Sequence, residues 1–209
     1  MAKVEPFEEY ASQYEGWFER NRFVYESELR AIREQLPENG DGIEIGVGSG
    51  RFAAPLGIKL GIEPSRKMRQ LAQSRGIETI EGIAERLPFR DSQFEFALMV
   101  TTICFVDDIQ ASFQEAYRVL KTGGCLIIGF IDKESSIGRS YQQHKKHSVF
   151  YRIATFYTVD EVVLNLEKIG FKNFNFTQTI FHNLSEIRAI EPVKEGYGEG
   201  SFVVISALK

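Results

Sequence analysis

Three glycines at alternate positions mark the first segment that could bind a ligand. In Glu44-Ile-Gly46-Val-Gly48-Ser-Gly50 they follow a short apolar run that carries one acid. Glycine lets backbone amides approach a ligand closely, and the start of the next helix offers positive potential. Glu63 ends the next apolar run, where a carboxylate can accept two hydrogen bonds from ribose hydroxyls. The simpler alternatives are a tight turn without a ligand and a carboxylate that only caps a helix.

The glycine spacing also separates two classes of nucleotide-binding enzyme. The dinucleotide fingerprint G-x-G-x-x-G needs a third glycine at position 51, where this chain carries Arg51. A nicotinamide-dependent oxidoreductase therefore remains a weaker alternative.

Two further segments carry polar groups at the expected ends of strands. The first is Glu81-Gly-Ile83-Ala84-Glu85-Arg-Leu-Pro-Phe-Arg-Asp91. The second is the apolar run that ends in Thr101-Thr102. Ligands of open α/β sheets bind at the carboxyl ends of strands, so both segments are expected beside the glycine turn.

Together these segments, in this order and spacing over about residues 42–131, resemble the class I S-adenosylmethionine-dependent methyltransferases. The small-molecule branch, which includes enzymes of ubiquinone and menaquinone biosynthesis ("methyltransferase type 11"), is the most similar. The turn resembles the family's motif I, and the Glu81–Asp91 segment resembles G-D-A-E-x-L-P-F-x-D, where the adenine lies. Ile83 departs from the family, which often has an aspartate there that reaches the adenine amino group.

The resemblance implies an enzyme with S-adenosyl-L-methionine as its cofactor and a small molecule as methyl acceptor. A protein that binds the cofactor without catalysis remains an alternative. The implied cofactor-binding residues are Tyr14, Glu44, Gly46, Gly48, Gly50, Glu63, Pro64, Met68, Ala84, Glu85 and Thr101.

Alternating strand and helix patterns predict the fold that must position these residues. We expect an α/β, Rossmann-like, doubly wound sheet of seven strands, mostly parallel with an antiparallel C-terminal strand, and a helical N-terminal cap. The expected strands are residues 42–46, 58–63, 77–81, 94–101, 125–131, 174–181 and 202–208.

The chain reads as a single methyltransferase domain, residues 1–209. Residues 1–37 form a cap of two helices, 41–131 the cofactor-binding core, 132–157 a lid over the substrate, and 158–209 a helix and an edge hairpin. Thr158 and Glu161 are spaced as a capping box, and Gly170 is expected to end the helix that they begin. Gly123-Gly124 is expected to end the helix before the fifth strand.

Methyl transfer by in-line displacement depends mainly on alignment and exclusion of water, with a general base where the acceptor starts protonated. We expect the acceptor pocket between the N-terminal cap and the segment after the fifth strand. Aromatic residues of the cap either line this pocket or pack in the core: Tyr10, Tyr14, Trp17 and Phe18. His144 and His147 are the candidate bases, unless they only belong to a solvated lid.

The charge and the motifs of the chain limit its possible binding partners. A net charge of −4 argues against nucleic acid as the main partner. The chain has no Asn-Pro-Pro-Tyr or Asn-Pro-Pro-Phe motif of the amino-directed DNA methyltransferases. We expect no metal site and no membrane span, and a cytoplasmic location, while the acceptor and the oligomeric state stay open.

Overall fold

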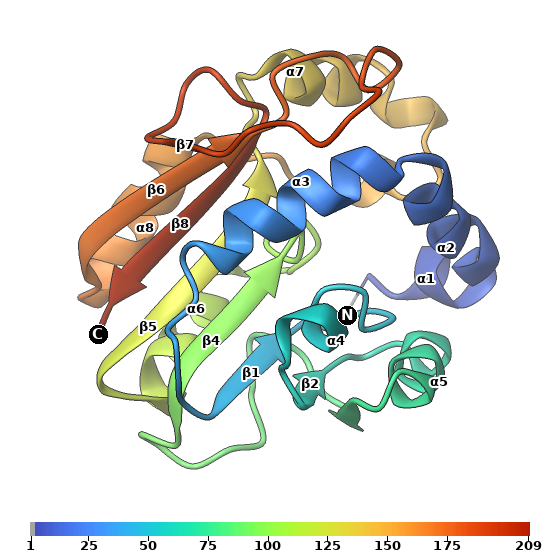
Figure 1. Cartoon of the computed structure of the whole chain (residues 1–209). Coiled ribbons are helices and arrows are strands. Elements are labelled where there is room, and N and C mark those ends of the chain that lie inside the picture. Colours follow the sequence, from blue (N-terminus) through green and yellow to red (C-terminus); the bar gives the residue numbers. More distant parts are fainter. Residues whose placement is uncertain (1–2) are drawn as a thin grey trace.

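One mixed sheet of eight strands organises residues 3–209, which are the residues that the computed structural model describes (Figure 1). The strand order is β3-β2-β1-β4-β5-β8-β6-β7. The strands are β1 (Gly42–Ile45), β2 (Leu60–Ile62), β3 (Glu78–Ile80), β4 (Phe94–Val100), β5 (Leu120–Ile131), β6 (Lys172–Thr179), β7 (Lys194–Glu195) and β8 (Phe202–Leu208).

The first five strands are parallel, and β8 runs antiparallel between β5 and β6. The strand order reverses at β1, which pairs with β2 on one side and with β4 on the other. In open α/β sheets such a switch point opens a crevice at the carboxyl ends of the strands. The glycine turn that follows β1 lies at this point.

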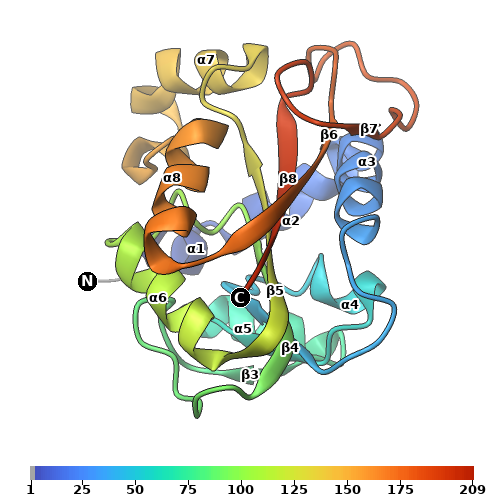
Figure 2. The same ribbon diagram turned by 90° about the vertical axis from the view of Figure 1, so that its left-hand side faces the viewer.

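Helices cover both faces of the sheet (Figure 2). On one face lie α3 (Arg22–Arg33), α4 (Ala53–Leu56) and α5 (Arg66–Ser74), which pack around Ile32, Phe52 and Phe202. On the other face lie α6 (Ile109–Val119) and α8 (Val159–Ile169), which pack around Phe113 and Phe171. Both faces are therefore buried, as expected for a sheet whose strands are nearly continuous apolar runs.

The N-terminal segment passes over the carboxyl ends of β1 and β2, as Figure 1 shows. It holds α1 (Glu5–Glu9) and α2 (Ala11–Arg20) before the chain enters α3. The prediction of two helices was wrong within the described residues, because Tyr10 has a non-helical conformation and separates α1 from α2.

The segment after β5 forms α7 (Ser136–Gln143) and two short 3-10 helices, Lys145–His147 and Tyr151–Ile153. Helix α8 then begins at the predicted capping box: the Thr158 side chain accepts from the Glu161 amide, and the Glu161 side chain accepts from the Thr158 amide. It ends at Gly170, which is left-handed with φ of +113°. These predictions of the helix ends are confirmed.

The predicted Rossmann-like α/β class is confirmed, but the predicted number of seven strands was wrong for the described part of the chain. The eighth strand is β7, whose two residues pair with Thr177 and Gln178 of β6. It lies in a stretch with Pro192 and several glycines that reads locally as a loop. Among residues 3–209, no helix combines the length and the apolar character needed to cross a bilayer.

Candidate active site

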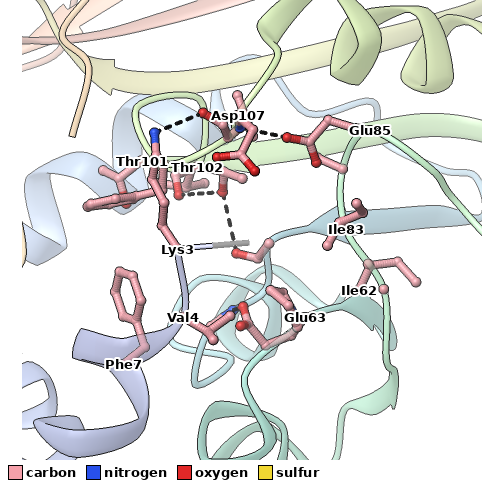
Figure 3. Close-up of a pocket in the computed structure, with 18 of the residues that line it drawn as sticks. Lys3, Val4, Phe7, Ile62, Glu63, Ile83, Glu85, Thr101, Thr102 and Asp107 are labelled. Atoms are coloured by element: carbon pink, nitrogen blue, oxygen red, sulfur yellow. Dashed lines mark hydrogen bonds between the residues drawn. The ribbon is translucent and has the colours of Figure 1, made fainter. Parts of the chain in front are cut away.

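A cavity of about 110 Å³ opens at the carboxyl ends of β1, β2 and β4 (Figure 3). Residues from the N-terminal segment, the glycine turn and the loops after β2, β3 and β4 surround it. Of the predicted cofactor-binding residues, it is lined by Tyr14, Gly46, Gly48, Glu63, Pro64, Ala84, Glu85 and Thr101. We call it the first cavity.

A side chain would be strained at two positions of the glycine turn. Gly46 and Gly48 have φ of +75° and +52°, which side chains disfavour. A Cβ at Gly46 would lie 2.4 Å from a side-chain carbon of Thr102, and one at Gly48 would lie 3.2 Å from the Tyr14 hydroxyl. Glycine at these positions therefore brings the bare backbone to the cavity wall.

Glu63 ties the end of β2 to this turn. Its Oε2 accepts a hydrogen bond from the Gly48 amide at 3.0 Å, and its Oε1 accepts one from the Ser65 amide at 2.8 Å. The side chain is buried, and burial outweighs these hydrogen bonds and raises the pKa of Glu63 to about 7. The carboxyl group is held at the cavity with little freedom to move.

Three predicted residues lie behind the cavity wall, outside its lining among the described residues. Gly50 packs against helix α5, where a Cβ would lie 3.2 Å from Ala72. Met68 is fully buried in α5, and its amide donates to the Ser65 hydroxyl. Glu44 is 1% exposed, and burial raises its pKa well above the usual range. These three residues can therefore support the shape of the turn, but they do not face the cavity.

Glu85 joins two loops at the rim. Its Oε1 accepts a hydrogen bond from the Asp107 amide at 2.7 Å, as Figure 3 shows. It also accepts one from the Asp108 amide at 3.3 Å. Asp108 in turn caps α6, as its Oδ1 accepts from the Ala111 amide. Ile83 also lines the first cavity, so this part of the wall is apolar where the family often carries an acid.

Thr101 has an uncommon backbone conformation directly after β4. Its φ is +50°, and its amide donates to the Gly129 carbonyl oxygen at 2.7 Å. A branched residue in the left-handed region costs about 1–3 kcal/mol and is found most often at functional sites. Thr101 lines the first cavity and also a second one.

The second cavity, of about 360 Å³, adjoins the first. The two share four lining residues: Phe7, Tyr14, Thr101 and Phe105. Helices α2 and α3 form one wall of the second cavity, and α7 with the following residues forms another. Its rings include Trp17, Phe18, Tyr141, Phe150 and Tyr151.

The two candidate histidines differ in their positions. His144 lines the second cavity, and its Nδ1 lies 2.9 Å from the Ser140 carbonyl oxygen. His147 is exposed and lies outside the lining of the cavities described within residues 3–209. Tyr10 is 40% exposed and is likewise outside this lining.

Comparison with known proteins identifies the family. A family model described as a methyltransferase domain matches residues 43–128. The crystal structure of an S-adenosylmethionine-dependent methyltransferase of Thermotoga maritima, described as a possible histamine N-methyltransferase, is 52% identical to this chain. It superposes with a TM-score of 0.97 over 99% of both chains. The chain belongs to the S-adenosylmethionine-dependent methyltransferases.

Further relatives in this family extend over most of the chain. An uncharacterised protein of Methanocaldococcus jannaschii is 46% identical over 97% of this chain and 98% of its own length. The demethylmenaquinone methyltransferase of Tropheryma whipplei is 29% identical over 71% of this chain and 73% of its own length. The cofactor of the family, S-adenosylmethionine, is the cofactor of this chain, as the resemblance of the motifs predicted.

Several residues that line the cavities were not predicted from the sequence. Phe7 and Phe105 contact each other edge to face, with ring centroids 5.1 Å apart, and lie where the two cavities meet. Glu28 lines the second cavity and was not selected as a site residue. A signal for Glu28 exists, because it lies four residues from both Val24 and Ile32, on the buried side of α3.

Proposed function

We propose that this methyltransferase moves the methyl group of S-adenosylmethionine to a small molecule held in the second cavity. The observation that carries the proposal is the junction of the two cavities at Phe7, Tyr14, Thr101 and Phe105. A donor in the first cavity and an acceptor in the second would meet there. In this arrangement residues 3–37, the described part of the predicted cap 1–37, act as the cap and residues 132–157 as the lid; residues 1 and 2 lie outside the described residues.

The first cavity fits the adenosyl part of the cofactor. We assign the ribose to Glu63, the methionine part to the Gly46–Gly50 turn and Thr101, and the adenine to Ile83, Ala84 and Pro64. Tyr14 and Glu85 close the rim, while Glu44, Gly50 and Met68 support the turn from behind. S-adenosylmethionine, when bound, supplies a methyl group that is already activated by a positively charged sulfur.

The chain's own residues then have to align the acceptor and keep water out. Holding two reactants in line can replace a large part of the entropic cost of their meeting. The aromatic rings around the junction form a rigid apolar wall, and Tyr14 lines both cavities. Burial raises the pKa of the Tyr14 hydroxyl above its usual range, so this group stays neutral.

The size and the lining of the second cavity support a small acceptor. Ligand pockets for small molecules are mainly apolar, with a few polar groups that fix orientation. The amine in the description of the Thermotoga maritima structure is a molecule of this size class.

Two measurements test the proposal. Thermal unfolding with S-adenosylmethionine, S-adenosylhomocysteine and NAD should show stabilisation by the first two, since a ligand that binds the folded state raises its stability. A metabolite extract incubated with methyl-labelled donor should gain a labelled product by mass spectrometry. Stabilisation by NAD alone, or donor binding without labelled product from any extract, would contradict the proposal.

A further inference from the structure

One carboxyl group interrupts the aromatic wall of the second cavity. Glu28 is 4% exposed and is the single acid in the lining among the described residues. Within residues 3–209, no hydrogen bond or ion pair satisfies its carboxyl group. Its carboxyl oxygens keep access to the cavity, so a ligand or solvent there is available to satisfy them where no group of the described chain does.

The neighbouring polar residue of the same helix is fully satisfied. Ser27, also buried in α3, donates its hydroxyl to the Phe23 carbonyl oxygen at 2.6 Å. The Ser27 hydroxyl also accepts from the Glu191 amide at 2.9 Å. Ser27 therefore has a structural role, whereas Glu28, one position further along the helix, has none within the described chain.

The packing of α3 holds Glu28 toward the cavity. Val24, Ala31 and Ile32 are buried on the same side of the helix and pack against the sheet. Glu28 lies between Val24 and Ile32 at helical spacing, and so it shares their buried side. An apolar residue would complete this stripe without cost, but the chain has a carboxyl group there.

The surroundings of Glu28 suit a cation. Tyr141 and Tyr151 line the cavity with stacked rings, 4.5 Å between centroids, and Trp17 lines it from α2. The faces of such rings attract a positive charge. Burial raises the pKa of Tyr141 to about 12 and that of Tyr151 well above its usual range, so both hydroxyls stay neutral. Burial also raises the pKa of Glu28 to about 8, and an ammonium group beside it would favour its ionised form.

The other charged or titratable groups of the lining do not neutralise Glu28. Arg20 and His144 are exposed side chains, and neither forms an ion pair with it among the described residues. Tyr14 is the remaining one, and its hydroxyl is neutral. Tyr25, on α3 itself, donates its hydroxyl to the Arg51 carbonyl oxygen. A ligand is therefore the available source of a positive charge.

We propose that Glu28 binds the methyl acceptor through an amino group, so that the second cavity takes a small aromatic or apolar amine and the reaction is N-methylation. This inference rests on the proposed function and names its substrate class. A buried carboxylate among aromatic rings complements an ammonium group both by charge and by cation–π attraction.

Glu28 also provides a destination for the proton that the amine must lose. An ammonium nitrogen has no free electron pair, so one proton passes from it to a Glu28 carboxylate oxygen. The freed pair forms the bond from nitrogen to the methyl carbon. The bond from that carbon to the donor sulfur breaks, and its electron pair stays on sulfur. The product leaves as a methylated ammonium ion. The proton now on Glu28 passes to solvent before the next turnover, so each methyl transfer releases one proton.

Matched amines and alcohols test the inference. The probes are 2-phenylethylamine and tryptamine, each compared with its alcohol, 2-phenylethanol and tryptophol. Calorimetry in the presence of S-adenosylhomocysteine should show that the wild-type protein prefers each amine, and mass spectrometry with the methyl donor should show N-methyl products. Preference for the alcohols, or O-methyl products alone, would overturn the inference.

The variant Glu28→Gln keeps the shape and removes the charge. We expect it to weaken amine binding by about 10–100-fold, the scale of one charged hydrogen bond, and to leave the alcohols nearly unchanged. Glu26→Gln is the matched control, because Glu26 lies on the same helix in an ion pair with Arg22 and outside both lining sets. Equal amine affinity in the wild type and in Glu28→Gln would overturn the inference.

Binding of S-adenosylhomocysteine distinguishes failure of the proposed function from failure of the inference about Glu28. If the wild-type protein does not bind it, the proposed function fails. If Glu28→Gln binds it as the wild type does, the variant is folded and its amine affinity is a valid test. If that variant does not bind it, Glu28→Asp, which keeps the charge, must still prefer each amine over its alcohol. Loss of this preference in a Glu28→Asp protein that binds S-adenosylhomocysteine would overturn the inference.

Discussion

The carboxylate of Glu63 is hydrogen-bonded to the backbone of Gly48, with 3.0 Å between Oε2 and the amide nitrogen. The two residues follow neighbouring parallel strands, β2 and β1, whose carboxyl ends meet at the same edge of the sheet. Two motifs that lie well apart in the sequence therefore form one unit of the cavity wall. A ligand that reaches this wall contacts both.

This unit predicts the effect of removing the Glu63 side chain. We expect Glu63→Ala to weaken S-adenosylhomocysteine binding by roughly 1.5–3 kcal/mol, the scale of hydrogen bonds to a charged group. Isothermal calorimetry measures this directly. Glu78→Ala is the control, since Glu78 is exposed on β3 and outside the lining of both cavities. This variant should bind S-adenosylhomocysteine as tightly as the wild type does. An affinity of Glu63→Ala within error of the wild type would remove Glu63 from the ribose site.

The turn itself is tested by adding one methyl group. In Gly48→Ala the new Cβ would stand 3.2 Å from the Tyr14 hydroxyl, at φ of +52°. We expect a loss of stability of about 1–2 kcal/mol from the left-handed backbone, and a loss of S-adenosylhomocysteine binding of at least tenfold. Urea unfolding and calorimetry measure the two effects.

Gly57→Ala is the matched control for the backbone cost. Gly57 is left-handed with φ of +80° at the end of α4, and a Cβ there would meet no atom within 4 Å. It should lose similar stability and keep its affinity for the ligand. If both variants kept full affinity, the turn would not be part of the binding site.

Burial of Glu28 predicts a dependence of stability on pH. Its pKa is raised from 4.5 to about 8 in the folded protein, so the folded state holds this proton to a higher pH than the unfolded state does. Its contribution to stability is therefore fully present below pH 4.5 and is lost as the pH rises through about 8. Gln cannot ionise, so Glu28→Gln lacks this loss.

We expect the free energy of unfolding of the wild type, relative to Glu28→Gln, to fall between about pH 5 and pH 8, by at most about 1.4 kcal/mol per pH unit. Urea unfolding at several pH values gives both curves. Glu26→Gln, the control on the same helix, should follow the wild type in parallel. Parallel curves for the wild type and Glu28→Gln would mean that the Glu28 carboxyl group is solvated in the folded protein.

Features with a local cause could be predicted from the sequence. The capping box at Thr158 and the left-handed Gly170 need only their neighbours, and both predictions are confirmed. The prediction that Gly123-Gly124 ends a helix was wrong, because α6 already ends at Val119. There the Gln93 amide donates to the Val119 carbonyl oxygen and Leu120 pairs with Phe94, so contacts with a distant strand override the local signal.

The site residues also fall into a group that could be predicted from the sequence and a group that could not. The glycine turn and Glu63 follow from motif spacing, because strand ends in a parallel sheet meet at one edge. The cavity junction does not follow from it, since Phe7 and Phe105 are brought together only by the packing of α1 over the loop after β4. Glu28 carried a readable signal, an acid in the buried stripe of α3, but its meaning depends on the cavity that α7 completes.

The two histidines give the last prediction, because the proposal assigns the proton to Glu28 and to neither histidine. His147 is exposed and outside the cavity lining, so His147→Ala should keep full turnover with an amine acceptor. The Nδ1 of His144 lies 2.9 Å from the Ser140 carbonyl oxygen, so we expect His144→Ala to change turnover by less than about threefold. Glu28→Gln should lower turnover by about 100-fold, the scale of general-base catalysis. Steady-state rates of methyl transfer at pH 7 and pH 9 provide the comparison. A large loss in His144→Ala together with normal turnover in Glu28→Gln would assign the proton transfer to the histidine.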